Sequence, residues 1–469
     1  MKVEQQRYSI AIVCDFFYPQ LGGVENHIWS LAQALIRKGH KVIILTKSYG
    51  DREGVRYMES GLKVYYLPLL NMAAGVVHVG YYSWLHLWRQ IMIREKVQIV
   101  HYHQSTTLLQ IISSLYCVAG NIKTVYTDHS LMGFADTACV SLNKIVQCSL
   151  SNVDHMIAVS YTSRETLCLR THHQPQDISV IPNAVDATRF YPNLNLRGTT
   201  DVINVVVLSR LVYRKGVDLL LLVIPMVCKA CPKVHFIIGG DGNKKIDLEC
   251  MIYKYRLQDR VELLGGIEPS ETQNIYNRGD VFLNCSLTEA FCIAILEAAA
   301  CGLEVVSTPA GGVEEVLPSS ILQLCTFESE DIAAKLIAAI HKVAEKKKIE
   351  GEIERSAFAY NELVKNSYSW GKVADRAEIV YNTVMSSRHS LLYHMQTYMS
   401  AGPIAGFCYL LLMLISFLFL FIFDIVTPAS TIEPAYDFYR DVYLQQTENK
   451  LKGKLGNSAS PNSVLQPLL

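Results

Sequence analysis

The sequence lacks an excess of charge of either sign. It carries 43 Lys and Arg against 43 Asp and Glu, so the formal net charge is zero at pH 7. A strongly basic field that would attract nucleic acid is therefore missing, and so is the acidic composition of a disordered, solvating chain. We expect a folded protein with no nucleic-acid partner.

The sequence also lacks a disulfide framework, a zinc-ligand spacing and a recognisable leader. Its 13 cysteines are scattered, and Cys228 and Cys231 form the only Cys-x-x-Cys pair, with no second pair or nearby His. Scattered thiols are typical of a reducing compartment. The first apolar run, Ile10–Val13, is too short for a signal peptide and is followed by Asp15, so we expect a first strand there.

Two fingerprints of cofactor chemistry are missing as well. No Gly-x-Gly-x-x-Gly follows the first expected strand, and only Asp51 follows the second as a ribose-binding acid, which disfavours a nicotinamide dehydrogenase. No Asp-x-Asp occurs in the chain. His101 and His103 share one face of an expected strand, but without a further definite ligand they do not indicate a metal site. We expect no metal and no cofactor.

Apolar residues, in contrast, are abundant: 50% of the chain is hydrophobic, 18% is charged, and the mean hydropathy is +0.18. A concentrated share lies in Ile404–Phe423, 20 residues without a charge. As a helix this run would span about 30 Å, the thickness of a bilayer core. We expect a single membrane-spanning helix, because one domain seldom hides a helix of this length with no polar face. The alternative is a buried core helix.

The charges beside this run indicate its orientation. Lys372, Arg376 and Arg388 precede it, whereas the sequence that follows is mainly acidic. Although the bias is weak, the excess of Lys and Arg places the preceding side in the cytosol. We therefore expect a cytosolic catalytic body and a luminal tail over residues 424–469, which is polar and unstructured from Lys450.

Before this run, short β-rich segments alternate with amphipathic helical stretches. The expected strands are Ser9–Phe17, Lys41–Lys47, Lys63–Pro68, Val97–His103, Lys123–His129, His155–Ser160, Ile178–Pro182, Ile203–Ser209, Val234–Gly239, Val261–Leu264, Val281–Asn284 and Val305–Thr308. Near-continuous apolar strands separated by helices indicate parallel sheets that are covered on both faces. The fold class is therefore α/β.

A polar, turn-rich stretch, Tyr191–Thr200, interrupts the alternation and is typical of a linker. We expect two doubly wound, Rossmann-like domains that face a cleft at the carboxyl edges of both sheets, where such folds bind ligands. The expected segments are 1–190 for an acceptor-side domain, 200–368 for a donor-binding domain, 369–403 for a terminal helix and juxtamembrane segment, 404–423 for the transmembrane helix and 424–469 for the tail.

The most informative segment for chemistry is 284–318. A strand is expected to end at Asn284 and a helix to begin near Phe291, so Glu289 lies at or just before the helix N-terminus and Glu297 lies inside it. Two carboxylates so placed can accept hydrogen bonds from hydroxyl groups at different points of one elongated ligand, which suggests a sugar. Alternatively, Glu289 simply caps the helix and Glu297 is solvated. The residues by themselves leave both interpretations open.

Other polar groups are expected at the same sheet edges. Arg210 and Lys215 follow a strand and open a helix, where both could converge on phosphates. Gly22 and Gly23 form a glycine turn between the first strand and the first helix. His129 follows another strand and would point into the cleft as a neutral hydrogen-bonding group, although a lone His is more often structural.

Several segments together resemble retaining nucleotide-sugar glycosyltransferases of family 4, which have the GT-B fold. SLTEAFCIAILEAAACG is similar to the E-x7-E signature of that family, and SRLVYRKGVDLLL, IIGGDG, VELLGG, IPNAVD and GGVE follow its other signatures in order. More specifically, VCDFFYPQLGGVENHIWSLAQALIRKGHKVIILT and TDHSLMGFAD resemble the phosphatidylinositol N-acetylglucosaminyltransferase catalytic subunits, which begin GPI-anchor biosynthesis at the endoplasmic reticulum. The resemblance covers roughly residues 8–390.

This resemblance implies roles for the residues above. Glu289 would face the donor sugar hydroxyls and Glu297 the ribose, while Arg210 and Lys215 would hold the UDP diphosphate and stabilise the leaving group. The family's acceptor is phosphatidylinositol, its donor is UDP-GlcNAc, and no metal is needed. One departure is Glu304, where many family members have Pro.

The resemblance further implies that Gly22 and Gly23 contact the diphosphate from the other domain, and that His129 lies beside the reacting centre. The expected partners are UDP-GlcNAc, phosphatidylinositol, the membrane and other chains of a multi-protein membrane complex. Two alternatives stay open: another lipid-linked glycosyltransferase, such as a dolichol-pathway or phosphatidylinositol mannosyltransferase, and an inactive glycosyltransferase-like scaffold.

Overall fold

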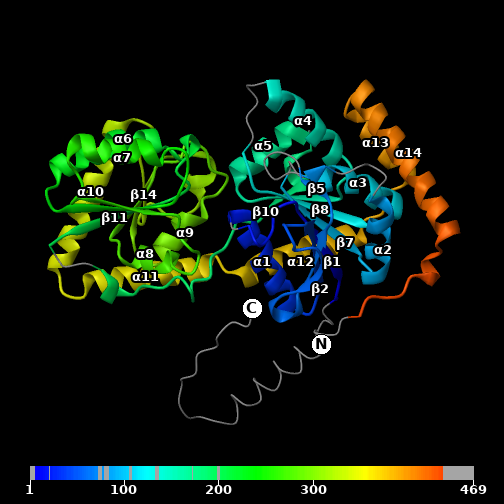
Figure 1. The fold of residues 1–469 in the computed structure, drawn as a ribbon, viewed down its shortest axis with the longest axis horizontal. Coiled ribbons are helices and arrows are strands. Elements are labelled where there is room, and N and C mark those ends of the chain that lie inside the picture. The colour runs from blue at the N-terminus through cyan, green and yellow to red at the C-terminus, as the bar shows by residue number, and fades with distance from the viewer. Residues whose placement is uncertain are drawn as a thin grey trace, which may run out of the picture.

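The computed structural model describes residues 6–20, 22–71, 77–78, 84–104, 108–131, 137–171, 173–197 and 201–436. Two sheets, each covered by helices on both faces, lie side by side along the long axis of the molecule (Figure 1). The larger sheet has the order β10-β9-β8-β7-β1-β2-β4-β3 and the smaller one β13-β12-β11-β14-β15-β16. Apart from the antiparallel β3, the pairings in both sheets are parallel.

The first domain contains the larger sheet and a separate two-stranded ladder. Its strands are β1 (Ser9–Val13), β2 (Lys41–Lys47), β3 (Gly54–Tyr57), β4 (Lys63–Leu67), β5 (Leu70–Asn71), β6 (Val77–His78), β7 (Ile99–His103), β8 (Lys123–Asp128), β9 (His155–Ala158) and β10 (Ile178–Val180). Its helices are α1 (Gly23–Arg37), α2 (Leu85–Glu95), α3 (Leu108–Gly120), α4 (Thr137–Leu150) and α5 (Tyr161–Thr171).

The second domain repeats this architecture. Its strands are β11 (Ile203–Leu208), β12 (Val234–Gly239), β13 (Val261–Gly265), β14 (Val281–Asn284), β15 (Glu304–Ser307) and β16 (Leu322–Leu324). Its helices are α6 (Val217–Ala230), α7 (Lys245–Tyr255), α8 (Thr272–Asn277), α9 (Ile293–Ala300), α10 (Ser329–Lys348) and α11 (Glu352–Ser367). The predicted α/β class and the two doubly wound domains are confirmed.

The central strands are largely apolar because both faces of each sheet are covered there. In β1, Ile10 and Ile12 pack in one cluster with Leu31 of α1, whereas Ala11 and Val13 pack in another with side chains of α2 and α3. Successive side chains of a strand point to opposite faces, so each strand contributes to two cores. The alternation of strands and helices in the sequence therefore correctly predicted a sheet with helices on both faces.

Helix α12 (Trp370–Ser386) leaves the second domain and packs on the sheet of the first. Trp370 and Tyr381 are buried in the same cluster as Ile10 and Leu31, and the Tyr381 hydroxyl lies 2.8 Å from His101 Nδ1. The sequence suggested a separate terminal segment from residue 369. The structure instead makes α12 part of the first domain, because its apolar face completes that core.

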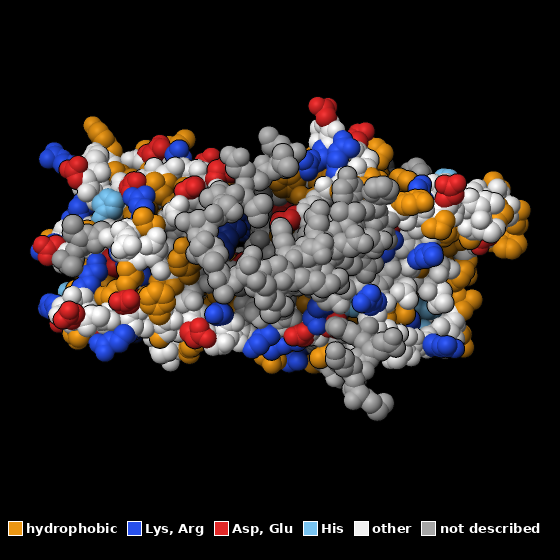
Figure 2. All heavy atoms as spheres, turned by 90° about the horizontal axis from the view of Figure 1, so that it is seen from below, with side chains coloured by type: hydrophobic (Ala, Val, Ile, Leu, Met, Phe, Trp, Pro, Cys, Tyr) orange, Lys and Arg blue, Asp and Glu red, His pale blue; other side chains and the backbone are white. Residues whose placement is uncertain are grey.

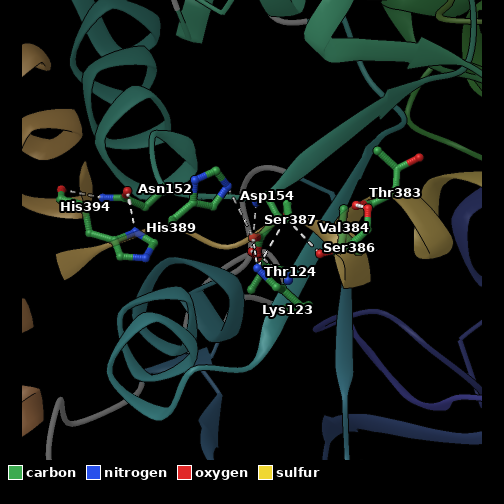
Figure 3. A network of polar contacts seen from close by, with 10 residues as sticks. All are labelled: Lys123, Thr124, Asn152, Asp154, Thr383, Val384, Ser386, Ser387, His389 and His394. Atoms are coloured by element: carbon green, nitrogen blue, oxygen red, sulfur yellow. Dashed lines mark hydrogen bonds and ion pairs between the residues drawn. The ribbon is translucent and has the colours of Figure 1, made fainter. Parts of the chain in front are cut away.

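Polar contacts fasten the connection between α12 and α13 (Leu391–Ser400) to the first domain (Figure 3). Lys123 Nζ donates to Ser387 Oγ at 3.3 Å and to Asp154 Oδ1 at 2.9 Å. His389 Nε2 lies 3.8 Å from the same Asp154 oxygen. Asn152 and His394 exchange two contacts, at 2.9 and 3.1 Å. These bonds hold the base of the apolar helix that follows.

Helix α14 (Pro403–Val426) contains the predicted run Ile404–Phe423 and is long and apolar enough to cross a membrane. Only 11% of its most apolar 18-residue window is buried, so the alternative of a buried core helix is not what the structure shows. Hydrophobic side chains gather at the end of the molecule where α14 lies (Figure 2, right). Its inner face, including the buried Met413, packs in the core cluster that contains side chains of α2 and α3.

The chain after α14 also contacts the first domain. Asp424 forms an ion pair with Arg89 of α2, and the Ala435 amide donates to the Arg94 carbonyl oxygen at 2.9 Å. The luminal side of residues 424–469 stays a prediction, and residues 437–469 lie outside the described part of the chain.

Candidate active site

The candidate residues follow the carboxyl ends of strands in both domains. Gly22 and Gly23 follow β1, His129 follows β8, Arg210 follows β11 and Glu289 follows β14. The two domains come into contact through loops at these sheet edges. A Cβ atom on Gly311 would lie 2.5 Å from Leu131 Cδ1 of the first domain and 2.2 Å from the Glu289 carbonyl oxygen. The loop that carries His129 is therefore packed beside the loop that carries Glu289.

Glu289 is held between a cation and a hydroxyl. Its Oε1 forms an ion pair with Lys215 Nζ and accepts a hydrogen bond from Ser286 Oγ at 2.8 Å. The Lys215 and Glu289 side chains are 20% and 13% exposed, so both remain accessible. Glu289 does not cap α9, which begins at Ile293 and has no side-chain cap. The interpretation of Glu289 as a helix cap is therefore wrong.

The charge of Arg210 in the second domain acts on a carboxylate beside the glycine turn of the first. Gly22 precedes α1 with φ −173°, and a Cβ atom there would lie 2.5 Å from Glu25 Oε2. Burial raises the pKa of Glu25, opposed by its own backbone N–H and by the charge of Arg210. Arg210 is exposed, and its positive charge acts on Glu25, which lies in the first turn of α1. Gly23 has no atom within 4 Å of its Cβ position.

Gly216 fixes the turn that carries Lys215. It has φ 70°, in the left-handed region, and a Cβ atom there would lie 1.8 Å from the Cys285 carbonyl oxygen. The Leu287 amide also donates to the Arg214 carbonyl oxygen at 2.9 Å. The loop after β11 is thereby fastened to the loop after β14, which keeps Lys215 beside Glu289.

Glu297 lies on α9 and accepts a hydrogen bond from the Tyr276 hydroxyl at 3.1 Å. Burial raises the pKa of Glu297 to about 6, and the Tyr276 hydrogen bond and the charge of Arg189 oppose this rise. The carboxylate therefore changes its protonation state near pH 6 and is mainly ionised at neutral pH. Its expected contact with a ribose stays a prediction.

His129 belongs to a group of histidines that the sequence did not bring together. Its Nε2 lies 2.9 Å from Nδ1 of His103, the last residue of β7. The ring of His27, on α1, lies 4.5 Å from the His129 ring, and His27 Nδ1 lies 2.7 Å from Asn183 Oδ1. Burial lowers the pKa of all three imidazoles, so they are neutral.

These three histidines could in principle hold a metal ion, because their ligand atoms lie within 4.8 Å of one another. The spacing fits a hydrogen bond better. Nitrogen atoms on a tetrahedral zinc ion lie about 3.3 Å apart, and both must offer lone pairs. His103 Nδ1 and His129 Nε2 are closer, at 2.9 Å, which places a hydrogen atom between them.

Sequence reasoning missed His27, His103, Glu25 and Ser286 as parts of this site. Ser286 was visible as a hydroxyl three residues before Glu289. His27 and His103 are far apart in the sequence. Of the two, the sequence indicated a place near the cleft for His103 alone, because this residue ends a strand.

Comparison with known proteins supports these observations. Residues 197–356 match the family model described as Glycosyl transferases group 1, and residues 47–136 match the model PIGA (GPI anchor biosynthesis). The chain is 45% identical to a human phosphatidylinositol N-acetylglucosaminyltransferase subunit over 438 residues, covering 92% of this chain and 88% of the human one. The Arabidopsis thaliana protein of the same name is 43% identical over 435 residues, covering 92% and 95%.

Among solved structures, sucrose-phosphate synthase from Thermosynechococcus elongatus superposes with a TM-score of 0.66. The sequence identity is 18%, and the alignment covers 81% of this chain and 100% of that one. At this identity the likeness shows the fold alone. Together with the matching glycosyltransferase model, it establishes the predicted GT-B fold.

Proposed function

The chain belongs to the phosphatidylinositol N-acetylglucosaminyltransferase family of its human and Arabidopsis thaliana relatives, and from this we propose its reaction. It transfers N-acetylglucosamine from UDP-GlcNAc to phosphatidylinositol, the first step of GPI-anchor biosynthesis. The observation that carries the proposal is the 45% identity to the human protein over nearly the whole chain. The pairing of Lys215 with Glu289 supports it, because a diphosphate joined to a sugar needs a cation and a hydrogen-bond acceptor close together.

The donor is held from both domains. Arg210 and Lys215 neutralise the diphosphate, and the N-terminus of α1 at Gly22 and Gly23 offers backbone N–H groups and a favourable dipole to the same anion. Glu289 accepts hydrogen bonds from hydroxyl groups of the sugar. Because the diphosphate contacts both domains, donor binding favours closure of the cleft.

The reaction proceeds with retention by attack on the face from which UDP departs. The bond between the sugar C1 and the β-phosphate oxygen breaks, a bond from C1 to the inositol 6-oxygen forms, and the hydroxyl proton passes to the departing phosphate. Positive charge grows on the ring and negative charge on UDP. Each preorganised cation contact can contribute about 2–4 kcal/mol to lowering the barrier. His129 lies beside the reacting centre, and no enzymic nucleophile or metal ion is required.

The protein works at a membrane as part of a complex. The relatives carry the word subunit in their names, which supports other chains as partners. Helix α14 supplies an apolar anchor that keeps the cleft near a lipid acceptor. We propose a single-pass protein of the endoplasmic reticulum membrane with the catalytic body in the cytosol. A luminal tail requires α14 to separate from the first domain on insertion, because Asp424 and Ala435 contact α2 in this structure.

The test is product formation in microsomes from cells that lack the endogenous enzyme and are complemented with this chain. Labelled UDP-GlcNAc is expected to give GlcNAc-phosphatidylinositol, GDP-mannose no product, and Glu289→Ala a loss of product at equal protein level. Glu362→Ala, an exposed acid on α11, is the matched control. Transfer from GDP-mannose would identify a different lipid-linked glycosyltransferase. Wild-type product from Glu289→Ala would sink the assignment of that residue.

A further inference from the structure

Four histidines lie together in the first domain, beside the loop that reaches the second. His101 and His103 are on β7, His129 follows the neighbouring strand β8, and His27 is on α1. The ring centroids of His101 and His103 are 4.3 Å apart, and those of His103 and His129 are 5.2 Å apart with nearly parallel planes. Neutral imidazoles packed this closely are ordered by their hydrogen bonds, so each tautomer follows from its partners.

Two of the four rings have partners outside the cluster. His101 Nδ1 lies 2.8 Å from the Tyr381 hydroxyl, and its Nε2 lies 2.7 Å from Thr127 Oγ1. His27 Nδ1 lies 2.7 Å from the amide oxygen of Asn183, which can only accept, so His27 carries its hydrogen on Nδ1. Neither ring competes for the contact between His103 and His129.

Which of the two rings donates this hydrogen bond follows from the surroundings of the other nitrogen atom of His103, Nε2. Its side chain is fully buried, and in the described part of the chain its Nε2 has no hydrogen-bond partner. A buried N–H group without an acceptor is rarer in proteins than a buried acceptor without a donor. The hydrogen of His103 therefore lies on Nδ1 and is donated to His129 Nε2 at 2.9 Å.

His129 consequently keeps its own hydrogen on Nδ1. In the described part of the chain this atom has no hydrogen-bond partner, but His129 is partly exposed, and its Nδ1, unlike His103 Nε2, is not among the buried atoms without a partner. Two residues further on, Leu131 Cδ1 lies 2.5 Å from the Cβ position of Gly311, beside the Glu289 carbonyl oxygen. The Nδ1–H group is thus carried by the segment that meets the donor-binding domain.

We propose that His103 is a positioning residue: its Nδ1–H group, donated to His129 Nε2, holds His129 in the Nδ1–H tautomer, so that His129 gives substrates a hydrogen-bond donor and not a base. This deepens the proposed function and rests on it for the identity of the substrates. A donor at this place stabilises oxygen atoms that gain negative charge. It also leaves the departing phosphate to take the acceptor's proton.

The test uses the full chain in its membrane complex, with ¹⁵N-labelled histidine. The signals of His129 are assigned with His129→Gln, and the imidazole ¹⁵N shifts report which nitrogen is protonated. We expect a protonated Nδ1 and a bare Nε2 in the wild type. His103→Asn, whose amide can still donate, is expected to keep this tautomer, whereas His103→Leu gives a mixture.

Kinetics separate positioning from folding. His103→Leu is expected to lower kcat about tenfold, the effect of one lost hydrogen bond, with the KM for UDP-GlcNAc within about twofold of the wild type. His103→Asn recovers most of the loss. His101→Asn, equally buried on the same strand but bonded elsewhere, is the matched control and leaves the His129 signals unchanged.

Three results overturn the proposal: a protonated Nε2 on wild-type His129, an unchanged tautomer and kcat in His103→Leu, or stoichiometric zinc that survives dialysis and shifts the His129 signals. The spectroscopic result does not depend on turnover. If the wild type shows the expected tautomer but forms no GlcNAc-phosphatidylinositol, the proposed function fails while the role of His103 stands.

Discussion

Lys215 Nζ contacts Glu289 Oε1, so the ammonium group that we expect to meet the diphosphate is already paired with the carboxylate that we expect to meet the sugar. The two residues come from loops after β11 and β14, and Ser286 Oγ holds the same carboxylate oxygen at 2.8 Å. An ammonium has three donors, so Lys215 can bridge the carboxylate and a phosphate. The carboxylate nevertheless neutralises part of the charge that attracts UDP.

This relationship predicts opposite effects on binding and transfer. Glu289→Gln removes the competing charge, so UDP is expected to bind about two- to fivefold more tightly, the range for one partly exposed ion pair, while sugar transfer falls. Lys215→Ala weakens UDP binding. Calorimetry on the purified complex measures both, and the double variant should resemble Lys215→Ala. Weaker UDP binding in Glu289→Gln would contradict the competition.

The raised pKa of Glu297 predicts pH-dependent donor binding. If the carboxylate accepts ribose hydroxyl groups, the ligand binds the deprotonated form, which is a minor species below pH 6. Affinity for UDP-GlcNAc is therefore expected to rise about tenfold from pH 5 to pH 7. UDP-GlcNAc is the right probe because its diphosphate does not titrate in this range. Glu297→Gln should flatten the profile, and a steep profile in that variant would assign the effect to another group.

Two glycines with similar dihedral angles allow a matched test of steric crowding. Gly216 has φ 70° and a Cβ position 1.8 Å from the Cys285 carbonyl oxygen, whereas Gly351 has φ 73° and open space. Gly351→Ala is expected to lower the free energy of unfolding by about 1–2 kcal/mol through backbone strain alone. Gly216→Ala should cost about 1–3 kcal/mol more and weaken UDP binding. Thermal unfolding measures both, and equal losses would show that the Cys285 loop yields easily.

The outer face of α14 predicts membrane attachment. Phe407 and Leu414 are 57% and 41% exposed, so charges placed there do not disturb the inner face that packs on the first domain. Phe407→Lys with Leu414→Lys is expected to move the protein from the membrane pellet to the supernatant after alkaline extraction. Leu222→Lys with Ile246→Lys, at side chains of the second domain that are 55% and 67% exposed, should leave it in the pellet. If the α14 variant stayed in the pellet, contacts other than the outer face of α14 would be sufficient to hold the protein in the membrane.

Strand positions were largely predictable from the sequence because apolar runs reflect burial on two faces. Lys41–Lys47, Val234–Gly239 and Val281–Asn284 were predicted with the bounds that β2, β12 and β14 have. The first strand was predicted to reach Phe17 but ends at Val13, because Phe17 is buried from a loop and composition does not reveal where backbone pairing stops. β3 was missed because all four residues of this antiparallel edge strand are exposed.

The site was predictable where it follows strand ends and not where it depends on long-range packing. Glu289 and Lys215 meet because the loops after two neighbouring strands lie side by side, as expected for parallel sheets. α9 begins two residues later than predicted, because Cys292 has a left-handed φ of 63°. The histidine cluster needed α1 and the ends of two strands to converge, which no spacing in the sequence encodes.

The return of α12 to the first domain makes the second domain an insertion with two points of attachment. The chain enters it near Phe190 and leaves it near Tyr368, and these passages are bonded: the Val185 amide donates to the Tyr368 carbonyl oxygen at 3.3 Å, and Asn361 Nδ2 to the Phe190 carbonyl oxygen at 2.9 Å. A single tether would let a domain swivel freely. Two adjacent connections restrict twisting and sliding more than a single linker does. We therefore expect the cleft to open and close by bending at this pair of connections, which returns Arg210 and Lys215 to the same register with the first domain after each cycle.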